Sequence, residues 1–424
     1  MLFNTTLNGC RSICLSAIVL VAGISASPSY ASADPALTLK EAITQTLERN
    51  PQLYQYTFAT EMFEARKQTH SLRPAIELEL EVENFAGSGD TQGFEGAETT
   101  LQLSSVIELG SKRKARMSLV DARINKNHWE QQAATLDVLG QLTQVFIEGL
   151  STQANIDLAN NSLDLSRSLF KAVQTRAKQG ATPEAEVMRA QAAVIRAELQ
   201  LAALTSKLQR QKILLAHFWG ETSPEFSHLN GSLFESGKSE SFDQLYARIK
   251  TSPSLQVFAS DARIKDAEIT LARTNSRSDI TWRAGVRRFE ETGDSALTAG
   301  LSIPLFASKR NRGEVKAALA ERNAIVYAKQ DSLLRLHAKL FQAWSLRNQN
   351  MDAVMKMEDT AIPALEKAFQ STKKAYENGR YRYQDLVAAQ EELLATKQAL
   401  IDAATNVQIS QVLIEQLTGA SISR

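Results

Sequence analysis

Cysteine is almost absent from this chain of 424 residues. Both cysteines, Cys10 and Cys14, lie near the start, beside a single charged residue, Arg11. The apolar run over 13–24 is too short to span a membrane, and Ala31-Ser32-Ala33 has the small-x-small form of a signal-peptidase site. We therefore predict a secretory signal peptide over 1–33. Its removal leaves no cysteine for disulfide bonds or thiolate metal sites.

Lipidation of the N-terminus is not expected. The residues up to Cys10 resemble a lipoprotein cleavage box, but they precede the apolar run, whereas such a box follows it.

Long apolar runs and net charge are also lacking. No stretch of 18 or more apolar residues follows residue 33, so no transmembrane helix is expected. The chain has 48 basic and 47 acidic residues, and Arg11 is the only charge before residue 34, so the charges of the mature chain balance. This composition gives no reason to expect a nucleic-acid partner. With only nine prolines, the chain favours long helices.

Catalytic motifs are missing as well. The five histidines stand alone in the sequence, and there is neither a His-x-x-x-His pair, nor a glycine-rich phosphate loop, nor a Gly-x-Ser-x-Gly elbow. We therefore expect no enzyme, no catalytic residues, no cofactor and no bound metal.

The sequence repeats itself at an offset of about 200 residues. The segments that recur in the same order are Asn50-Pro51-Gln52-Leu53 and Ser252-Pro253-Ser254-Leu255, Ser111-Lys112-Arg113 and Ser308-Lys309-Arg310, and Lys178-Gln179-Gly180 and Glu377-Asn378-Gly379. We predict a first structural repeat over 34–230 and a second over 231–424.

Both repeats have the same expected plan: a helix, two strands, a very long helix and a last helix. The helices are expected at 37–72, 111–179 and 183–219, and again at 242–274, 308–378 and 383–418. A helix of roughly 70 residues is about 100 Å long, which suits a coiled-coil rod or a tunnel. A narrow apolar stripe from Leu139 to Leu150 agrees with a coiled coil, although the helices alone fit a soluble bundle equally well.

The strands favour a membrane protein. Residues 76–83 alternate strictly, with Ile76, Leu78, Leu80 and Val82 on one face and Glu77, Glu79, Glu81 and Glu83 on the other. Further strands are expected at 100–107, 280–287 and 297–303. Four strands cannot close a barrel, because outer-membrane barrels have at least eight. Three chains would supply twelve. The alternative, a soluble four-stranded sheet, gives no reason for helices of this length.

With these motifs the chain resembles the TolC family of outer-membrane efflux proteins over essentially its whole mature length. The segments that carry the resemblance are Leu39-Lys40-Glu41-Ala42, Val106-Ile107-Glu108-Leu109-Gly110-Ser111-Lys112-Arg113, Leu301-Ser302-Ile303-Pro304-Leu305-Phe306 and Tyr376-Glu377-Asn378-Gly379. The second segment looks most like the CzcC branch, which serves heavy-metal efflux systems of the resistance-nodulation-division type.

The resemblance implies a mainly α fold with a small β part. In this fold a homotrimer shares a 12-stranded β-barrel in the outer membrane, set on a long periplasmic α-helical tunnel. It also implies a passive exit duct, and the CzcC-like branch implies divalent heavy-metal cations as its cargo. The expected partners are a periplasmic membrane-fusion adaptor, an inner-membrane resistance-nodulation-division pump and outer-membrane lipid.

The resemblance also assigns the periplasmic entrance. An aspartate at the position of Asp385 lines the constriction in the family, and Glu186 is its counterpart in the first repeat. Rings of such carboxylates favour cations. Ala388 stands where the best-known channel has a second aspartate, so the constriction is expected to be less acidic or differently placed. The residues expected to hold the entrance shut are Tyr376, Arg380, Tyr381 and Arg382. The alternative for both acids is a solvated helix face.

The helix tips and the barrel lumen complete the expected sites. The adaptor is expected to dock on Gly180, Ala181, Thr182, Gly379 and Arg380, which otherwise form simple hairpin turns. The side chains expected to face the lumen are Glu77, Glu79, Glu81, Glu83, Arg283 and Arg287. Clustered acids in a water-filled duct bias passage toward cations.

Two other functions remain open at this point. One is a duct for drugs or for a type I secreted protein, because the pump chooses the substrate. The other is a soluble periplasmic coiled-coil adaptor or scaffold. An adaptor would show one helical hairpin between lipoyl-like β segments, whereas this chain predicts two hairpins and alternating strands.

Overall fold

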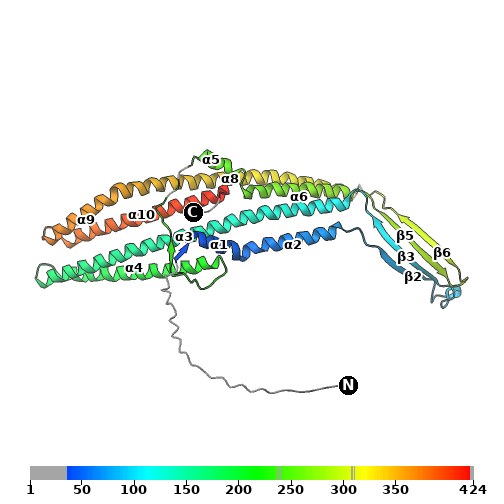
Figure 1. The fold of residues 1–424 in the computed structure, drawn as a ribbon, viewed down its shortest axis with the longest axis horizontal. Helices are drawn as coiled ribbons and strands as arrows, with labels where there is room; N and C mark the ends of the chain where they lie inside the picture. Colours follow the sequence, from blue (N-terminus) through cyan, green and yellow to red (C-terminus); the bar gives the residue numbers. More distant parts are fainter. Residues whose placement is uncertain (1–35, 236, 238–239, 307–308, 310, 421–424) are drawn as a thin grey trace, which may run out of the picture.

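The computed structural model describes residues 36–235, 237, 240–306, 309 and 311–420. The predicted signal peptide therefore lies outside the described residues, as do Ser308 and Arg310 of the repeated segments. The described chain is long and narrow, mainly helical, with a sheet at one end and two helical hairpin turns at the other (Figure 1).

The first predicted helix, 37–72, is in fact a short strand and two helices: β1 (Ala36–Thr38), α1 (Leu39–Arg49) and α2 (Pro51–Ser71). The break follows from Pro51, which has no N–H to continue α1 and instead begins α2. The side chain of Asn50 caps α2 by accepting a hydrogen bond from the amide of Leu53 at 3.2 Å. The predicted helix 242–274 is divided in the same way at Pro253, into α5 (Phe242–Ile249) and α6 (Pro253–Asn275).

The long helix of the first half is confirmed as α3 (Lys112–Lys178), which has 67 residues. Its counterpart over 308–378 is not one regular helix. α8 (Arg312–Lys356) passes through a π-helical turn, η2 (Met357–Ala361), into α9 (Ile362–Glu377). Pro363 lies in the first turn of α9, where it removes one helical hydrogen bond, and this accounts for the irregular turn before it.

The last helix of each half is α4 (Glu184–His217) and α10 (Tyr383–Thr418). Among the described helices, none is long and apolar enough to cross a membrane.

The predicted strands form one antiparallel sheet in the order β2-β3-β5-β6. Their bounds are β2 (Glu77–Glu83), β3 (Glu98–Ile107), β5 (Ile280–Phe289) and β6 (Ser295–Ser302), with a short 3-10 turn, η1 (Gly89–Thr91), between the first two. The register aligns Leu80, Leu101, Val286 and Leu297 in one row across the sheet. The predicted alternation is therefore confirmed, and one face of the sheet is apolar.

A second sheet was not predicted. β1 pairs in parallel with β4 (His228–Asn230), and each strand has only three residues, too few to show alternation in the sequence. The pair lies near the middle of the molecule (Figure 1). Here Leu37 and Leu229 join the largest apolar cluster, together with Phe146 and Leu142 of α3.

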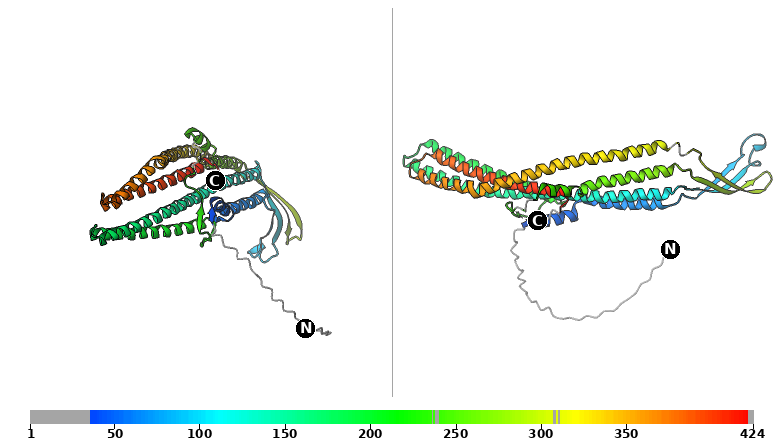
Figure 2. Two further views of the ribbon diagram at one scale, coloured as in Figure 1. Left: turned by 60° about the vertical axis from the view of Figure 1, so that its left-hand side comes forward. Right: turned by 90° about the horizontal axis from the view of Figure 1, so that it is seen from above.

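Strands and helices continue one another in the same order. α2, α3, α6 and α8 are neighbours in that order. Along the chain, α2 precedes β2, α3 follows β3, α6 precedes β5 and α8 follows β6. Figure 2 shows these helices side by side between the sheet and the middle of the molecule. The chain is thus a curved strip with two open edges, one formed by α2 and β2 and the other by α8 and β6.

Candidate functional site

The two predicted helix tips lie at the same end of the molecule (Figure 1). Gly180 ends α3 with φ of 72° and Gly379 ends α9 with φ of 74°, a left-handed conformation that glycine adopts without strain. The carbonyl oxygen of Arg176 accepts the amide of Ala181 at 2.9 Å, and that of Ala375 accepts the amide of Arg380 at 2.9 Å. Both turns therefore end their helices in the same way: a backbone amide beyond the glycine donates a hydrogen bond to a carbonyl oxygen of the last helical turn.

Arg176 joins the two tips. Its guanidinium donates to the carbonyl oxygen of Tyr376 at 2.6 Å and lies 4.8 Å from the centre of the Tyr376 ring. Tyr376 is only 3% exposed and packs in one apolar cluster with Val173, Tyr383 and Leu386. The predicted entrance residue Tyr376 thus lies between the chain's own two hairpins. Burial raises the pKa of its hydroxyl, and the charge of Arg176 opposes this shift.

The other predicted entrance residues are more accessible. Arg380, Tyr381 and Arg382 are exposed, whereas Glu186 and Asp385 are half-buried in the first turns of α4 and α10. Asp385 accepts the amide of Arg382 at 2.9 Å and so caps α10. A carboxylate in this position is stabilised by the N-terminal end of the helix dipole. Arg176 and Tyr383 were not predicted as tip residues, because neither belongs to a recognisable turn motif.

The predicted lumen residues share the polar face of the large sheet. Arg287 links three other side chains of this face: it contacts Glu98 at 2.7 Å, Glu83 at 3.1 Å and the hydroxyl of Thr100 at 2.9 Å. Glu98 was missed because the predicted strand began at residue 100, yet the same two-residue alternation reaches it. One arginine therefore neutralises part of the charge of two carboxylates on neighbouring strands.

The remaining carboxylates of β2 lie in a row with other polar side chains. Gln102 donates to Glu79 at 2.9 Å across the β2–β3 pair. Arg283 is in register with Ser104 and Gly300 on the same face.

The opposite face of this sheet is apolar, and its side chains are exposed in the single chain. Its exposed side chains include Leu78 at 69%, Leu80 at 66%, Leu297 at 88% and Leu301 at 74%. An apolar patch across four strands is unfavourable in water and favourable against lipid or another apolar surface.

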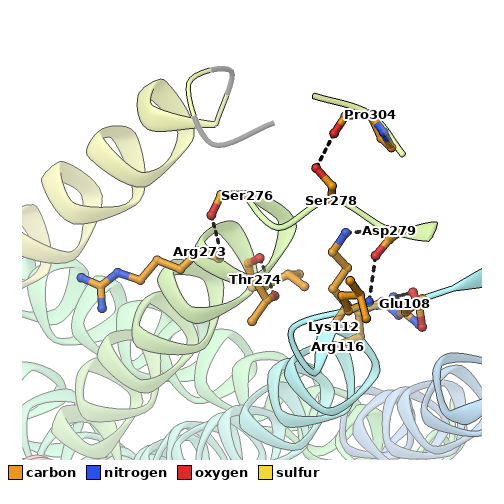
Figure 3. Close-up of polar contacts among 11 residues, drawn as sticks. Glu108, Lys112, Arg116, Arg273, Thr274, Ser276, Ser278, Asp279 and Pro304 are labelled. Atoms are coloured by element: carbon orange, nitrogen blue, oxygen red, sulfur yellow. Dashed lines mark hydrogen bonds and ion pairs between the residues drawn. The ribbon is translucent and has the colours of Figure 1, made fainter. Parts of the chain in front are cut away.

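Two ion pairs fix the junction between sheet and helices (Figure 3). Arg116 donates to both carboxylate oxygens of Glu108, at 2.5 and 2.9 Å, and Lys112 contacts Asp279 at 2.7 Å. Asp279 also accepts the amide of Leu109 at 3.0 Å. The hydrogen bond from Arg116 holds the pKa of Glu108 below its ordinary value. Together these contacts link the entry of α3 to the entry of β5.

The junction explains the residue types of the segment 106–113. Gly110 has φ of 80°, and a Cβ atom there would lie 2.6 Å from the Cδ atom of Arg277. A side chain at this position would be strained by the positive φ and would have to displace the side chain of Arg277. The sequence pointed to the segment, but its partner Asp279 comes from the second half of the chain.

Metal ligation has no evident place in the described residues. No group of three or more His, Cys, Asp or Glu side chains in that part of the chain could hold a metal ion.

Comparison with known proteins agrees with this architecture. The family model described as "Outer membrane efflux protein" matches residues 42–221 and 245–420. The solved structure of CusC superimposes with a TM-score of 0.77 at 16% identity, covering 90% of this chain and 92% of that one. VceC from Vibrio cholerae gives a TM-score of 0.74 at 18% identity, covering 91% and 97%. These structures share the fold.

Three curated proteins are similar in sequence. The cobalt-zinc-cadmium resistance protein CzcC of Cupriavidus metallidurans is 23% identical, over 70% of this chain and 72% of CzcC. The pyoverdine export outer membrane protein OpmQ of Pseudomonas putida is 23% identical, over 62% and 57% of the two chains. The nickel-cobalt-cadmium resistance protein NccC of Alcaligenes xylosoxydans xylosoxydans is 24% identical, over 59% and 56%. The matched region thus spans less than two thirds of OpmQ and of NccC.

Proposed function

Since the chain belongs to the outer membrane efflux protein family, we propose that three copies form one passive exit duct for divalent heavy-metal cations. The family membership places the protein in the outer membrane, as an efflux channel. The cargo is inferred from CzcC and NccC, whose names state cobalt, zinc, cadmium and nickel resistance.

The observation that carries the proposal is the open strip of four helices and four strands in matching order. β2 and β6 each have one edge without a partner among the described strands, and unpaired edges need covering. Pairing β6 of one copy with β2 of the next closes a barrel of twelve strands from three chains, which exceeds the minimum of eight.

The edge helices support the same assembly. Along α2, exposed apolar side chains recur every four residues, at Tyr54, Phe58 and Met62. Along α8, exposed apolar residues recur at Val326, Leu334 and Phe341. Rows of this kind are typical of helix–helix contacts. In the trimer α2 of one copy packs against α8 of the next, and both rows are buried.

In this assembly the apolar face of the sheet meets lipid and its polar face lines the lumen. Glu77, Glu79 and Glu81 supply negative charge along the water-filled duct, while Arg287 offsets Glu83 and Glu98. The remaining excess of carboxylates favours cations over anions.

At the periplasmic end, Asp385 and Glu186 form rings of three carboxylates each. The exposed side chains of Arg380, Tyr381 and Arg382 contact the neighbouring copy and keep the resting entrance closed. The turns at Gly180 to Thr182 and at Gly379 to Arg380 dock on the periplasmic membrane-fusion adaptor. A resistance-nodulation-division pump in the inner membrane supplies the energy, and this chain performs no catalysis.

The proposal includes the two structural repeats, 34–230 and 231–424. Each half contributes a long helical segment, which η2 interrupts in the second half, together with a last helix and two strands of the large sheet. The family model matches once in each half. Duplication of one unit accounts for the matching order of helices and strands.

A second cargo is favoured by the match to OpmQ, whose name states export of pyoverdine. In that case the duct passes an organic molecule, and the pump and adaptor differ. The acidic lumen is then a solvated surface without a role in selection.

Growth of a deletion strain on Zn, Co, Cd, Ni and Cu salts separates the two cargoes. Metal export predicts reduced tolerance to at least one of these ions, restored by the wild-type gene. Unchanged tolerance to all five, with reduced export of an organic compound, would contradict the metal assignment. Conductance of the purified protein in a planar bilayer tests the duct itself, independently of the cargo.

A further inference from the structure

A groove of about 700 Å³ lies where the large sheet joins α3. Its walls come from the segment before β2, from the end of β3, from the start of α3 and from β5. The groove opens on the apolar face of the sheet, because Ile76, Ile107 and Trp282 all belong to that face by register and alternation.

The rim of the groove is basic. Arg73, Arg113 and Lys114 are all exposed, and none of them forms an ion pair with any described residue. Arg113 makes one long contact, a hydrogen bond of 3.5 Å to the carbonyl oxygen of Ser71. Three positive charges thus surround an apolar floor, and none of them has an acidic partner in the part of the chain that the structure describes.

The nearby acids are already engaged. Glu108 is held by Arg116 and Asp279 by Lys112, so neither carboxylate is available to neutralise the rim. These two acids form ion pairs, whereas the three cations of the rim form none with the described residues, and this contrast indicates a site for an external anion.

The groove lies at one border of the apolar band. β3 and β5 carry exposed Leu101, Leu103 and Val286 on the same face as Trp282, and the chain continues from Ile107 into α3. Aromatic side chains mark the borders of outer-membrane strands, and basic side chains just outside such a border lie at the depth of the lipid headgroups. Since α3 runs toward the periplasm, this border is the periplasmic one.

We propose that the groove binds one anionic phospholipid from the inner leaflet of the outer membrane. Its phosphate pairs with Arg73, Arg113 and Lys114, and its acyl chains lie on Ile76, Ile107 and Trp282. The inference rests on the proposed function, in which the apolar face of the sheet meets lipid. It adds a lipid partner at the joint between barrel and tunnel.

Native mass spectrometry of the purified trimer, titrated with phosphatidylglycerol or phosphatidylethanolamine, tests the site. The wild type is expected to bind phosphatidylglycerol more tightly than phosphatidylethanolamine. The triple variant Arg73→Gln, Arg113→Gln, Lys114→Gln is expected to bind phosphatidylglycerol about tenfold more weakly or worse, because it loses the three positive charges that pair with the lipid phosphate.

Two control variants isolate the effect. Arg189→Gln, Lys207→Gln, Arg210→Gln removes the same charge from exposed positions on α4 and is expected to bind as the wild type does. Arg73→Lys, Arg113→Lys keeps the charge and is expected to retain most of the affinity. The controls also show whether charge removal by itself disturbs the trimer.

Equal affinity of the wild type for the two lipids would overturn the proposal. Equal phosphatidylglycerol binding by the two triple variants would do so too. If the variant Arg73→Gln, Arg113→Gln, Lys114→Gln retains lipid binding but loses binding of the adaptor, the rim is a site for a protein partner instead. Conductance of the wild type in a planar bilayer is measured in parallel, so that failure of the duct and failure of the lipid site give different results.

Discussion

The guanidinium of Arg176, at the end of α3, caps the carbonyl oxygen of Tyr376, at the end of α9, at 2.6 Å. The same group lies 4.8 Å from the centre of the Tyr376 ring. The two residues are 200 positions apart and stand one turn before Gly180 and Gly379, respectively. Their contact therefore sets the position of one hairpin tip relative to the other, at the end of the molecule assigned to the entrance.

Arg176→Gln is expected to loosen the two tips. The variant loses a charge-assisted hydrogen bond to a half-buried acceptor and a cation–π contact, which together stabilise the contact between the two tips by about 2 kcal/mol. Single-channel recording is expected to show more frequent or larger openings than in the wild type. Arg189→Gln removes an exposed arginine near the same tip and is the control. An intact Arg176→Gln trimer with wild-type conductance would show that this contact does not hold the entrance.

Asp385→Asn is expected to lower cation selectivity at the entrance. Asparagine keeps the oxygen that caps α10, so the helix start is preserved while three charges per trimer are lost. The reversal potential in a salt gradient measures the change, and Glu186→Gln is expected to add to it. The assignment of the entrance is wrong if Asp385→Asn and Tyr381→Ala both leave selectivity and conductance unchanged.

Arg287→Gln is expected to weaken the sheet and to raise cation selectivity. The variant leaves Glu83 and Glu98 without their shared partner, which costs about 1–3 kcal/mol for a partly buried charged group. Arg283→Gln is the control, because it removes the same charge from the same face and breaks no ion pair among the described residues. The melting temperature in thermal unfolding is expected to be lower for Arg287→Gln than for Arg283→Gln. Equal melting temperatures would contradict this role of Arg287.

Acid is expected to weaken the junction through Glu108. Its pKa lies below the ordinary value of 4.5 in the folded state, because Arg116 donates a hydrogen bond to the carboxylate. The pair therefore stabilises the fold at neutral pH, and this contribution is lost as the pH falls through the lowered pKa. Glu108→Gln is expected to melt at a lower temperature at pH 7 and to lose less stability than the wild type on acidification. If the melting temperatures of the wild type and of Glu108→Gln fall in parallel as the pH is lowered, this linkage is ruled out.

Phe58→Asp is expected to prevent or weaken trimer formation. The side chain of Phe58 is 64% exposed in the single chain and lies in the middle of the apolar row on α2. A buried, unpaired carboxylate in the contact with α8 of the next copy is unfavourable. Light scattering after size-exclusion chromatography measures the mass. Phe94→Asp, in the loop after β2 and 68% exposed, is the control and is expected to remain trimeric. A trimeric Phe58→Asp protein would place the interface elsewhere.

Elements that depend on local chemistry could be predicted from the sequence alone. Strict alternation in 76–83 determined a strand with one acidic and one apolar face, because successive side chains of a strand point to opposite faces. Gly180 and Gly379 determined where the long helices end, because each occupies a left-handed position. The single helices predicted at 37–72 and 242–274 are wrong, because Pro51 and Pro253 have no N–H to continue the preceding helix and each begins a new one.

Contacts between the two halves of the chain could be known only from the folded structure. The pairing of Lys112 with Asp279 joins positions 167 apart, and that of Arg176 with Tyr376 joins positions 200 apart. No local pattern specifies such partners, since they depend on which helix faces lie together once the core has packed. The pairing of the three-residue strands β1 and β4 likewise depends on how the core packs and not on a local pattern. The basic rim at Arg73, Arg113 and Lys114 depends on packing in the same way. That these three side chains lack ion pairs with the described residues could be seen only once the partners of Glu108 and Asp279 were known.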